Sequence, residues 1–207
     1  MSSAQRTPVV PLEAGAGPEN PPCPACGEPL FGWLPPRTGL GGPISRCESC
    51  GLGVVGAPGD PAEALRELGA GEHSPQIANR ASFAASLGSA GWAGLEPGSR
   101  YLFTVESVRR LLARRDQVVK SRRWAPAASL AATWQTLLNS VTFGHNVALA
   151  ACGRGDAAKA KHAWQRRIDA LASVVLAIPA LAIAIPVELA GGLSGRGAII
   201  SLRFELL

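Results

Sequence analysis

Aromatic residues are scarce in this sequence and make up 5% of its 207 residues. They are few even beside the most basic segment, residues 109–123, where seven of fifteen side chains are Arg or Lys. Proteins that bind single-stranded nucleic acid without sequence preference stack the bases on aromatic rings beside basic grooves. The composition therefore argues against stacking on single strands, and nucleic acid is not an expected partner.

The start of the chain also lacks the apolar segment after a basic stretch that marks a secretory signal peptide. The chain has five cysteines, and free thiols suit a reducing compartment better than an oxidising one. We therefore expect the protein to be cytoplasmic. The formal net charge is +5.

Four of the five cysteines form two matched pairs, and this is the most specific pattern in the sequence. Cys23 and Cys26 form the first pair, and Cys47 and Cys50 form the second. A loop of 20 residues separates the two pairs. Each Cys-x-x-Cys-Gly turn can direct two thiolates to one point, and two turns supply the four soft ligands of tetrahedral zinc. The glycine after each second cysteine permits a bend at positive φ. Such a site has no open coordination position, so the expected cofactor is a structural zinc ion.

A disulfide pair and a redox-active Cys-x-x-Cys remain as alternative interpretations of the same residues. Phe31, Trp33 and Leu34 lie between the two turns, where we expect them to pack over the metal. Cys152 is left over, and we expect it to be buried in a helix rather than catalytic.

Glycine and proline are concentrated in the first half of the chain, which should therefore be rich in loops. Asp60 and Pro61 suit the N-terminal cap and the first position of a short helix over Pro61–Leu68. The predicted organisation is a disordered tail over 1–20, a zinc ribbon over 21–56, a loop-rich linker with this short helix over 57–100, and a helical region over 101–207.

In the helical region, Thr104 can cap a helix over Val105–Arg115, and a second helix is predicted from Ala127 to Thr142. The second helix has one apolar face formed by Leu130, Trp134, Leu137, Leu138 and Val141. Asp156 is the expected cap of a third, longer helix. Residues 117–123 and 198–206 are predicted as strands. The fold class is therefore α+β, small and helix-rich, with a four-cysteine zinc ribbon, a short two-stranded β element and an apolar C-terminal helix.

That apolar helix, predicted over residues 170–190, contains Ala170–Val187, 18 residues without a charge. Its length of about 27 Å, at 1.5 Å per residue, is just short of the roughly 30 Å hydrocarbon core of a bilayer. Three interpretations remain open: a buried helix of a soluble fold, a helix that lies on or dips into a membrane, and a transmembrane span. Arg166 and Arg167 would favour a cytoplasmic N-terminal side if it spans.

The basic residues at 109–123 have three interpretations of their own. They suit an anionic lipid surface, they can contact nucleic-acid phosphates, or they form a solvated helix face and strand end. The last is the simplest.

Several motifs follow in one order along the chain. They are Arg-Cys-Glu-Ser-Cys-Gly-Leu-Gly-Val at 46–54, Asn-Arg-Ala-Ser at 79–82, Gly-Trp-Ala-Gly-Leu-Glu-Pro at 91–97, and Tyr-Leu-Phe-Thr-Val-Glu-Ser-Val-Arg-Arg-Leu-Leu at 101–112. Together they resemble bacterial class I S-adenosylmethionine-dependent methyltransferases that begin with a zinc ribbon. The resemblance covers about two thirds of the chain. It implies descent from a methyltransferase whose C-terminal helices and closing strand are retained here.

The cofactor-binding core of that family has no counterpart in this sequence. A class I methyltransferase needs a Gly-x-Gly turn at a strand end and an acidic residue about 20 positions later. About ten residues separate Leu68 from Asn79, where the family has its first five strands. Also, Asp116-Gln117 stands where the family has Gly-Phe. No cofactor-binding residue can be assigned from the resemblance.

Three functions are consistent with these features. The first is a non-catalytic zinc-ribbon protein that acts as a binding or membrane-proximal module, with a membrane, a protein partner or a second copy of itself covering residues 170–190. The second is a methyltransferase-like protein that works with a full-length partner, and the third is a nucleic-acid-associated zinc ribbon. His73, His145 and His162 are isolated in the sequence, so no catalytic residue is assigned and the enzymatic hypothesis is the weaker one.

Overall fold

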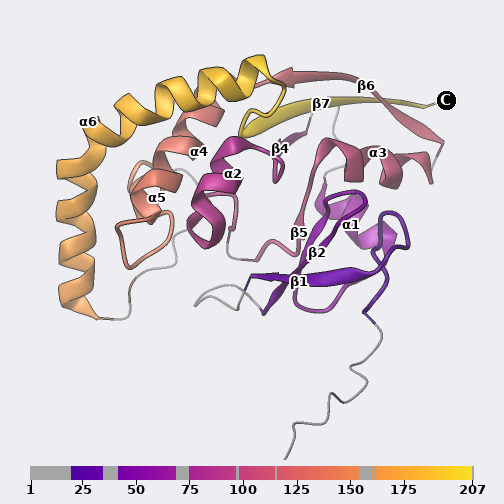
Figure 1. Cartoon of the computed structure of the whole chain (residues 1–207), viewed down its shortest axis with the longest axis horizontal. Coiled ribbons are helices and arrows are strands. Elements are labelled where there is room, and N and C mark those ends of the chain that lie inside the picture. The colour runs from indigo at the N-terminus through magenta and orange to yellow at the C-terminus, as the bar shows by residue number, and fades with distance from the viewer. Residues whose placement is uncertain are drawn as a thin grey trace, which may run out of the picture.

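The computed structural model describes residues 20–34, 42–68, 75–96, 98–114, 116–153, 160 and 162–206. In this part of the chain there are six α-helices and two antiparallel sheets, so the α+β class and the apolar C-terminal helix are confirmed (Figure 1). The expected disordered tail, the expected helix cap Asp156 and His73 lie outside the described residues, apart from Asn20.

The first sheet contains the ribbon. Its strands are β1 (Leu30–Leu34), β2 (Ile44–Cys47), β3 (Gly53–Val55) and β5 (Tyr101–Leu102), in the order β1-β2-β3-β5. Between β3 and β5 in the chain lies α1 (Pro61–Glu67), where the Asp60 side chain accepts a hydrogen bond of 2.7 Å from the Glu63 amide. The predicted cap of this helix is therefore confirmed.

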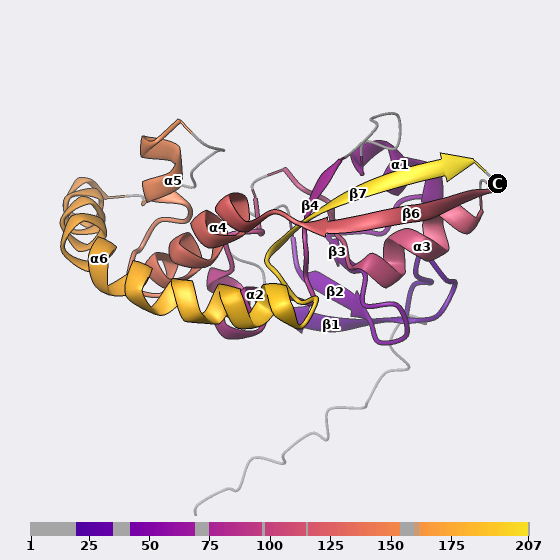
Figure 2. The ribbon, with the colours of Figure 1, turned by 90° about the horizontal axis from the view of Figure 1, so that it is seen from above.

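The second sheet contains the predicted pair of strands and one more. β6 (Gln117–Trp124) pairs with β7 (Ile199–Leu206), and β4 (Gln76–Ala78) pairs with the other edge of β7. β7 is therefore the central strand. Figure 2 shows β6 and β7 side by side over α3, with α4 and α6 at the opposite end of the molecule. A strand of three residues such as β4 is too short to give a periodic sequence signal.

The ribbon and the C-terminal half share one hydrophobic core. α3 (Val105–Ala113) begins at Thr104, whose hydroxyl accepts a hydrogen bond of 3.0 Å from the Ser107 amide. This helix buries Val108, Leu111 and Leu112, which belong to the same cluster as the ribbon cysteines, Leu65 of α1 and Leu202 of β7. Because these side chains exclude water together, the ribbon cysteines lie inside the main core.

The second predicted helix is α4 (Pro126–Asn139), and Leu138 of its predicted apolar face is fully buried, but its other buried residues are polar. Trp134 and Leu137 are only partly buried, and Val141, beyond the end of the helix, is exposed. Gln135, Thr136 and Asn139 are buried because each has a hydrogen-bond partner: Asn139 accepts from Gln135, and Thr136 accepts from the Ala93 amide. Buried polar groups with partners leave no apolar pattern for sequence reasoning to detect.

Two short helices complete the structure beside α4. α2 (Phe83–Gly88) packs against α4, and α5 (Val147–Ala151) follows it. Cys152 comes directly after α5 and is exposed, so the prediction that it is buried in a helix was wrong. The helix ends one residue before it, which leaves its side chain in solvent.

The apolar helix α6 (Ala163–Leu193) has 31 residues and contains the predicted segment 170–190, but its N-terminal cap is His162 and not the expected Asp156. It is bent (Figure 1), and Pro179 and Pro186 lie inside it, each without the amide hydrogen that a straight helix uses. Among the described helices it is the one long and apolar enough to cross a membrane, judged by length and composition alone. Only 11% of its most apolar window is buried, so most of this segment is exposed in the single chain.

Candidate metal centre

The four predicted cysteines come together at one end of the first sheet. The Sγ atoms of Cys23, Cys26, Cys47 and Cys50 all lie within 4.8 Å of one another. Cys23 and Cys50 are 3.6 Å apart, and Cys26 and Cys47 are 3.4 Å apart. Four thiolates around zinc at about 2.3 Å would be separated by about 3.8 Å. The cluster therefore has the size and donor set to hold a metal ion.

The two turns that carry these cysteines are built alike. In the first, the Gly27 amide donates to the Cys23 carbonyl at 2.8 Å, and in the second, the Gly51 amide donates to the Cys47 carbonyl at 3.0 Å. Gly27 has φ +84° and Gly51 has φ +76°, as the Cys-x-x-Cys-Gly pattern predicts. Such φ angles strain residues that have a Cβ, so each turn depends on its glycine.

The second turn is held by the start of α3. The Thr104 hydroxyl donates a hydrogen bond of 2.6 Å to the Cys50 carbonyl. A Cβ on Gly51 would lie 2.9 Å from the Thr104 methyl group, which shows how closely the two segments pack. On the exposed side, Arg110 of α3 donates to the Ser49 hydroxyl at 3.1 Å and forms an ion pair with Glu106. Helix α3 therefore fixes the position of two ligands.

Hydrogen bonding between Cys23 and Cys50 shifts the pKa values of these two thiols in opposite directions. The hydrogen bond with Cys50 lowers the pKa of Cys23 to about 5, although burial opposes this shift. The same bond raises the pKa of Cys50, and burial raises the pKa of Cys26. Ionising all four thiols in this setting requires a compensating cation, which a divalent metal supplies.

The site is closed to solvent. Cys23, Cys47 and Cys50 are buried and Cys26 is partly buried, so four sulfurs enclose the position that a metal would occupy. A metal held in this way has no free position for a substrate. The centre therefore suits a structural ion rather than a catalytic one.

The prediction that Phe31, Trp33 and Leu34 pack over this centre was wrong. Phe31 is exposed, and the other two pack against a second cluster that contains Trp92 and Leu102. The residue of β1 that packs against the cysteines is Leu30. The pairing of β1 with β2 shifts register between Gly32 and Leu34, and this irregularity interrupts the alternation of faces that a regular strand would show.

One basic side chain lies between the ribbon and the second cluster. The guanidinium of Arg80 stacks over the Trp33 ring, 4.3 Å from its centroid. Burial lowers the pKa of Arg80, and the nearby cation Arg46 adds to this effect, whereas the thiol of Cys50 opposes it. Its Nε atom is buried without a hydrogen-bond partner. A cluster of thiolates around a metal would supply negative charge near this cation.

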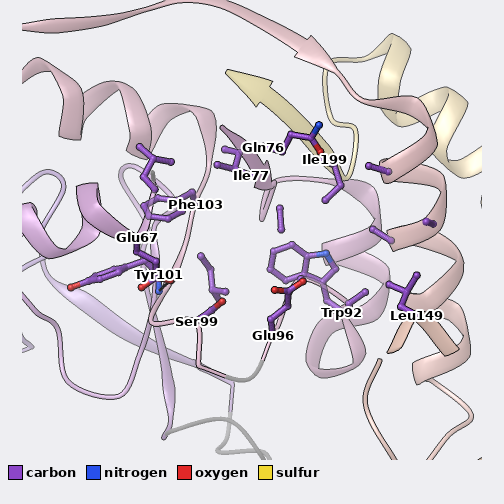
Figure 3. A pocket seen from close by; sticks show the side chains of 18 of the residues that line it. Glu67, Gln76, Ile77, Trp92, Glu96, Ser99, Tyr101, Phe103, Leu149 and Ile199 are labelled. Atoms are coloured by element: carbon purple, nitrogen blue, oxygen red, sulfur yellow. Dashed lines mark hydrogen bonds between the residues drawn. The ribbon is translucent and has the colours of Figure 1, made fainter. Parts of the chain in front are cut away.

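A cavity of about 630 Å³ lies between the first sheet, β4 and α4. Figure 3 shows Trp92 at its centre, Tyr101 and Phe103 on one wall, and the carboxylates of Glu67 and Glu96 near its edge. Glu67 accepts hydrogen bonds from the amides of Arg100 and Tyr101, and burial raises its pKa. The described residues that line the cavity include no cysteine, histidine or basic side chain.

The two histidines within the described residues do not gather at a site. His145 is buried in the loop before α5, and His162 is exposed at the start of α6. Neither is among the residues that line the cavity or the metal centre. No catalytic residue was assigned from the sequence, and the described residues place no histidine beside the cysteine cluster.

Sequence reasoning did not identify two buried carboxylates, Asp169 and Glu188, that hold α6 against the rest of the molecule. They are 1% and 3% exposed. Their position at the two ends of the uncharged segment is a signal that the sequence does contain.

Comparison of the chain with protein-family models, curated proteins and solved structures finds no match.

Proposed function

We propose that this chain is a non-catalytic, cytoplasmic zinc-ribbon protein that acts as a binding module at a membrane surface. The observation that carries the proposal is the exposed apolar helix α6 on a body that is stabilised by a closed metal centre. The resemblance to zinc-ribbon methyltransferases suggests how such a body arose, through loss of the cofactor-binding core.

Zinc is the metal that best fits the ribbon. Four thiolates are soft ligands, and the spacing of the sulfurs suits tetrahedral coordination. Because the site is closed, the zinc ion would stabilise the fold and would not activate a substrate.

The described cavity supports a non-catalytic role. Its walls combine aromatic and alanine side chains with carboxylates, and the described lining residues include no cysteine or histidine. The sequence also lacks the glycine turn on which S-adenosylmethionine binding depends.

The exposed apolar surface of α6 is the reason why we propose association with a membrane. Val174 is 76% exposed and Ile178 is 79% exposed, in a window whose mean hydropathy is 2.5. Burying one such side chain is worth about 1.5–3 kcal/mol. In a monomer in water most of these side chains stay hydrated. Contact with a bilayer surface would bury them and would be favoured by this free energy of transfer.

Three measurements test the proposal. Elemental analysis of protein purified without chelators should find one zinc ion per chain, and calorimetry should detect no binding of S-adenosylmethionine. The purified protein should float with liposomes in a density gradient. A soluble monomer that floats with no vesicle of any composition would refute the membrane role, and micromolar binding of S-adenosylmethionine would refute the non-catalytic one.

A further inference from the structure

We infer that α6 lies along the surface of a bilayer that contains anionic lipids, with both ends of the helix on the same side. This inference rests on the proposed function and specifies the orientation of the helix and the lipid class.

The topology of the second sheet fixes the side on which each end of α6 lies. β6 precedes α6 and β7 follows it, yet the two strands pair, with Val118 opposite Glu205 and Trp124 opposite Ile200. β4, which also precedes α6, pairs with the other edge of β7. If α6 crossed a bilayer, β7 would be separated from both neighbours and the sheet would be lost. A one-sided contact keeps it intact.

The inner face of α6 is held to the protein body near both ends. At one end, Asp169 accepts hydrogen bonds from the amides of Phe143 (2.7 Å) and Gly144 (2.9 Å). At the other end, Glu188 accepts from Trp124 Nε1 (2.9 Å) and the Ala198 amide (2.9 Å). Between them, Trp134 of α4 donates to the Ala177 carbonyl at 2.9 Å.

These contacts turn both acidic residues of α6 inward and leave the outer face apolar. A helix drawn into the bilayer core would leave two carboxylates without their donors, which is costly in hydrocarbon. A helix that stays in the interface keeps these contacts and buries its outer side chains between lipids. The exposed apolar residues of this face are Leu171, Val174, Val175, Ile178, Leu181, Ile183, Ile185, Leu189 and Leu193.

Basic side chains lie at both ends of this face. Arg167 is exposed in the first turns of α6. Beyond the C-terminal end of the helix, Arg122 is exposed and its guanidinium packs against Gly195. A Cβ built on this glycine would lie 3.0 Å from the guanidinium. Phosphate and carboxylate groups of anionic lipids complement this arrangement. Two copies of α6 packed lengthwise would instead bring basic ends together, which favours a lipid surface over a second copy.

The experiment is flotation of the full, metal-loaded chain with vesicles of phosphatidylcholine alone or of phosphatidylcholine mixed with phosphatidylserine. We expect binding to the mixed vesicles to be stronger and to fall as salt is raised. Arg122→Ala and Arg167→Ala should each weaken it about fivefold, as expected for one basic residue near an anionic surface. The matched control is Arg109→Ala, an exposed cation on α3, which should change binding little.

A second measurement tests the orientation. With a peptide tag at each terminus, protease added outside the vesicles should remove both tags. Protection of one tag would overturn the inference in favour of a span, and equal flotation with neutral vesicles would overturn the lipid class. The double variant Val174→Glu/Ile178→Glu changes two exposed residues and should abolish flotation. A dimer in solution that this variant converts to a monomer would show that a second copy covers the face, and would also overturn the inference. Loss of flotation with every vesicle would refute the proposed function itself.

Discussion

The hydroxyl of Thr104 and the carbonyl of Cys50 are joined by a hydrogen bond of 2.6 Å, which links the start of α3 to the turn that carries Cys47 and Cys50. The same hydroxyl accepts a hydrogen bond from the Ser107 amide, so one side chain both caps the helix and holds the Cys50 backbone. The metal centre and the hydrophobic core of α3 should therefore lose stability together.

Replacing Thr104 with Val should destabilise the protein by about 2 kcal/mol, because the change removes a helix cap and leaves the buried Cys50 carbonyl without this donor. Thr104→Ser keeps the hydroxyl and should cost much less. Denaturant unfolding of the metal-loaded proteins measures both. Equal stability of the Val and Ser variants would show that the hydroxyl does not support the turn.

Removing one ligand should disrupt more than the ribbon. Cys47→Ser should lower metal content and destabilise the whole domain, because the cysteines share a cluster with α1, α3 and β7. Cys152→Ser is the matched control, since Cys152 is exposed and distant from the cluster in sequence. Elemental analysis and thermal unfolding with and without chelator give the comparison, and an unchanged melting temperature for Cys47→Ser would contradict the role assigned to the metal.

Glu188→Ala should cost about 3 kcal/mol, because it leaves Trp124 Nε1, the Ala198 amide and the Thr133 hydroxyl without their acceptor. Leu189→Ala changes the neighbouring residue, which is 51% exposed, and should have little effect on unfolding in water. Urea unfolding in the absence of lipid compares the two. Similar losses for both variants would mean that Glu188 does not hold the helix.

Glu67 should make stability depend on pH. Burial raises its pKa in the folded protein above the unfolded value of about 4.3, so the native state binds more protons. The unfolding free energy contributed by this group should therefore fall as pH rises from about 4 through the folded pKa. Glu67→Gln removes this contribution, and urea unfolding across that range should show a smaller decline for the variant. Parallel curves would contradict the shift.

Local chemistry decided which parts of this structure were predictable. The cysteine spacing and the following glycines predicted the metal cluster, and Asp60 and Thr104 predicted two helix starts, because each signal acts within a few residues. Most of the buried face of α4 was not predictable, since Gln135 donates a hydrogen bond to Asn139, and Asn139 donates to the carbonyl of Gly91, which is far away in the sequence. The inward positions of Asp169 and Glu188 depend on partners in other elements, and the only local signal for them is their place at the two ends of the uncharged segment.

The central place of β7 also has a consequence for the order in which the molecule can be completed. β7 follows every other element in the chain, yet both β4 and β6 need it as their neighbour. During synthesis α6 therefore emerges before the strand that closes the sheet, and before the Ala198 amide that binds Glu188. The newly made apolar helix is therefore exposed while the sheet that holds its C-terminal end is still open.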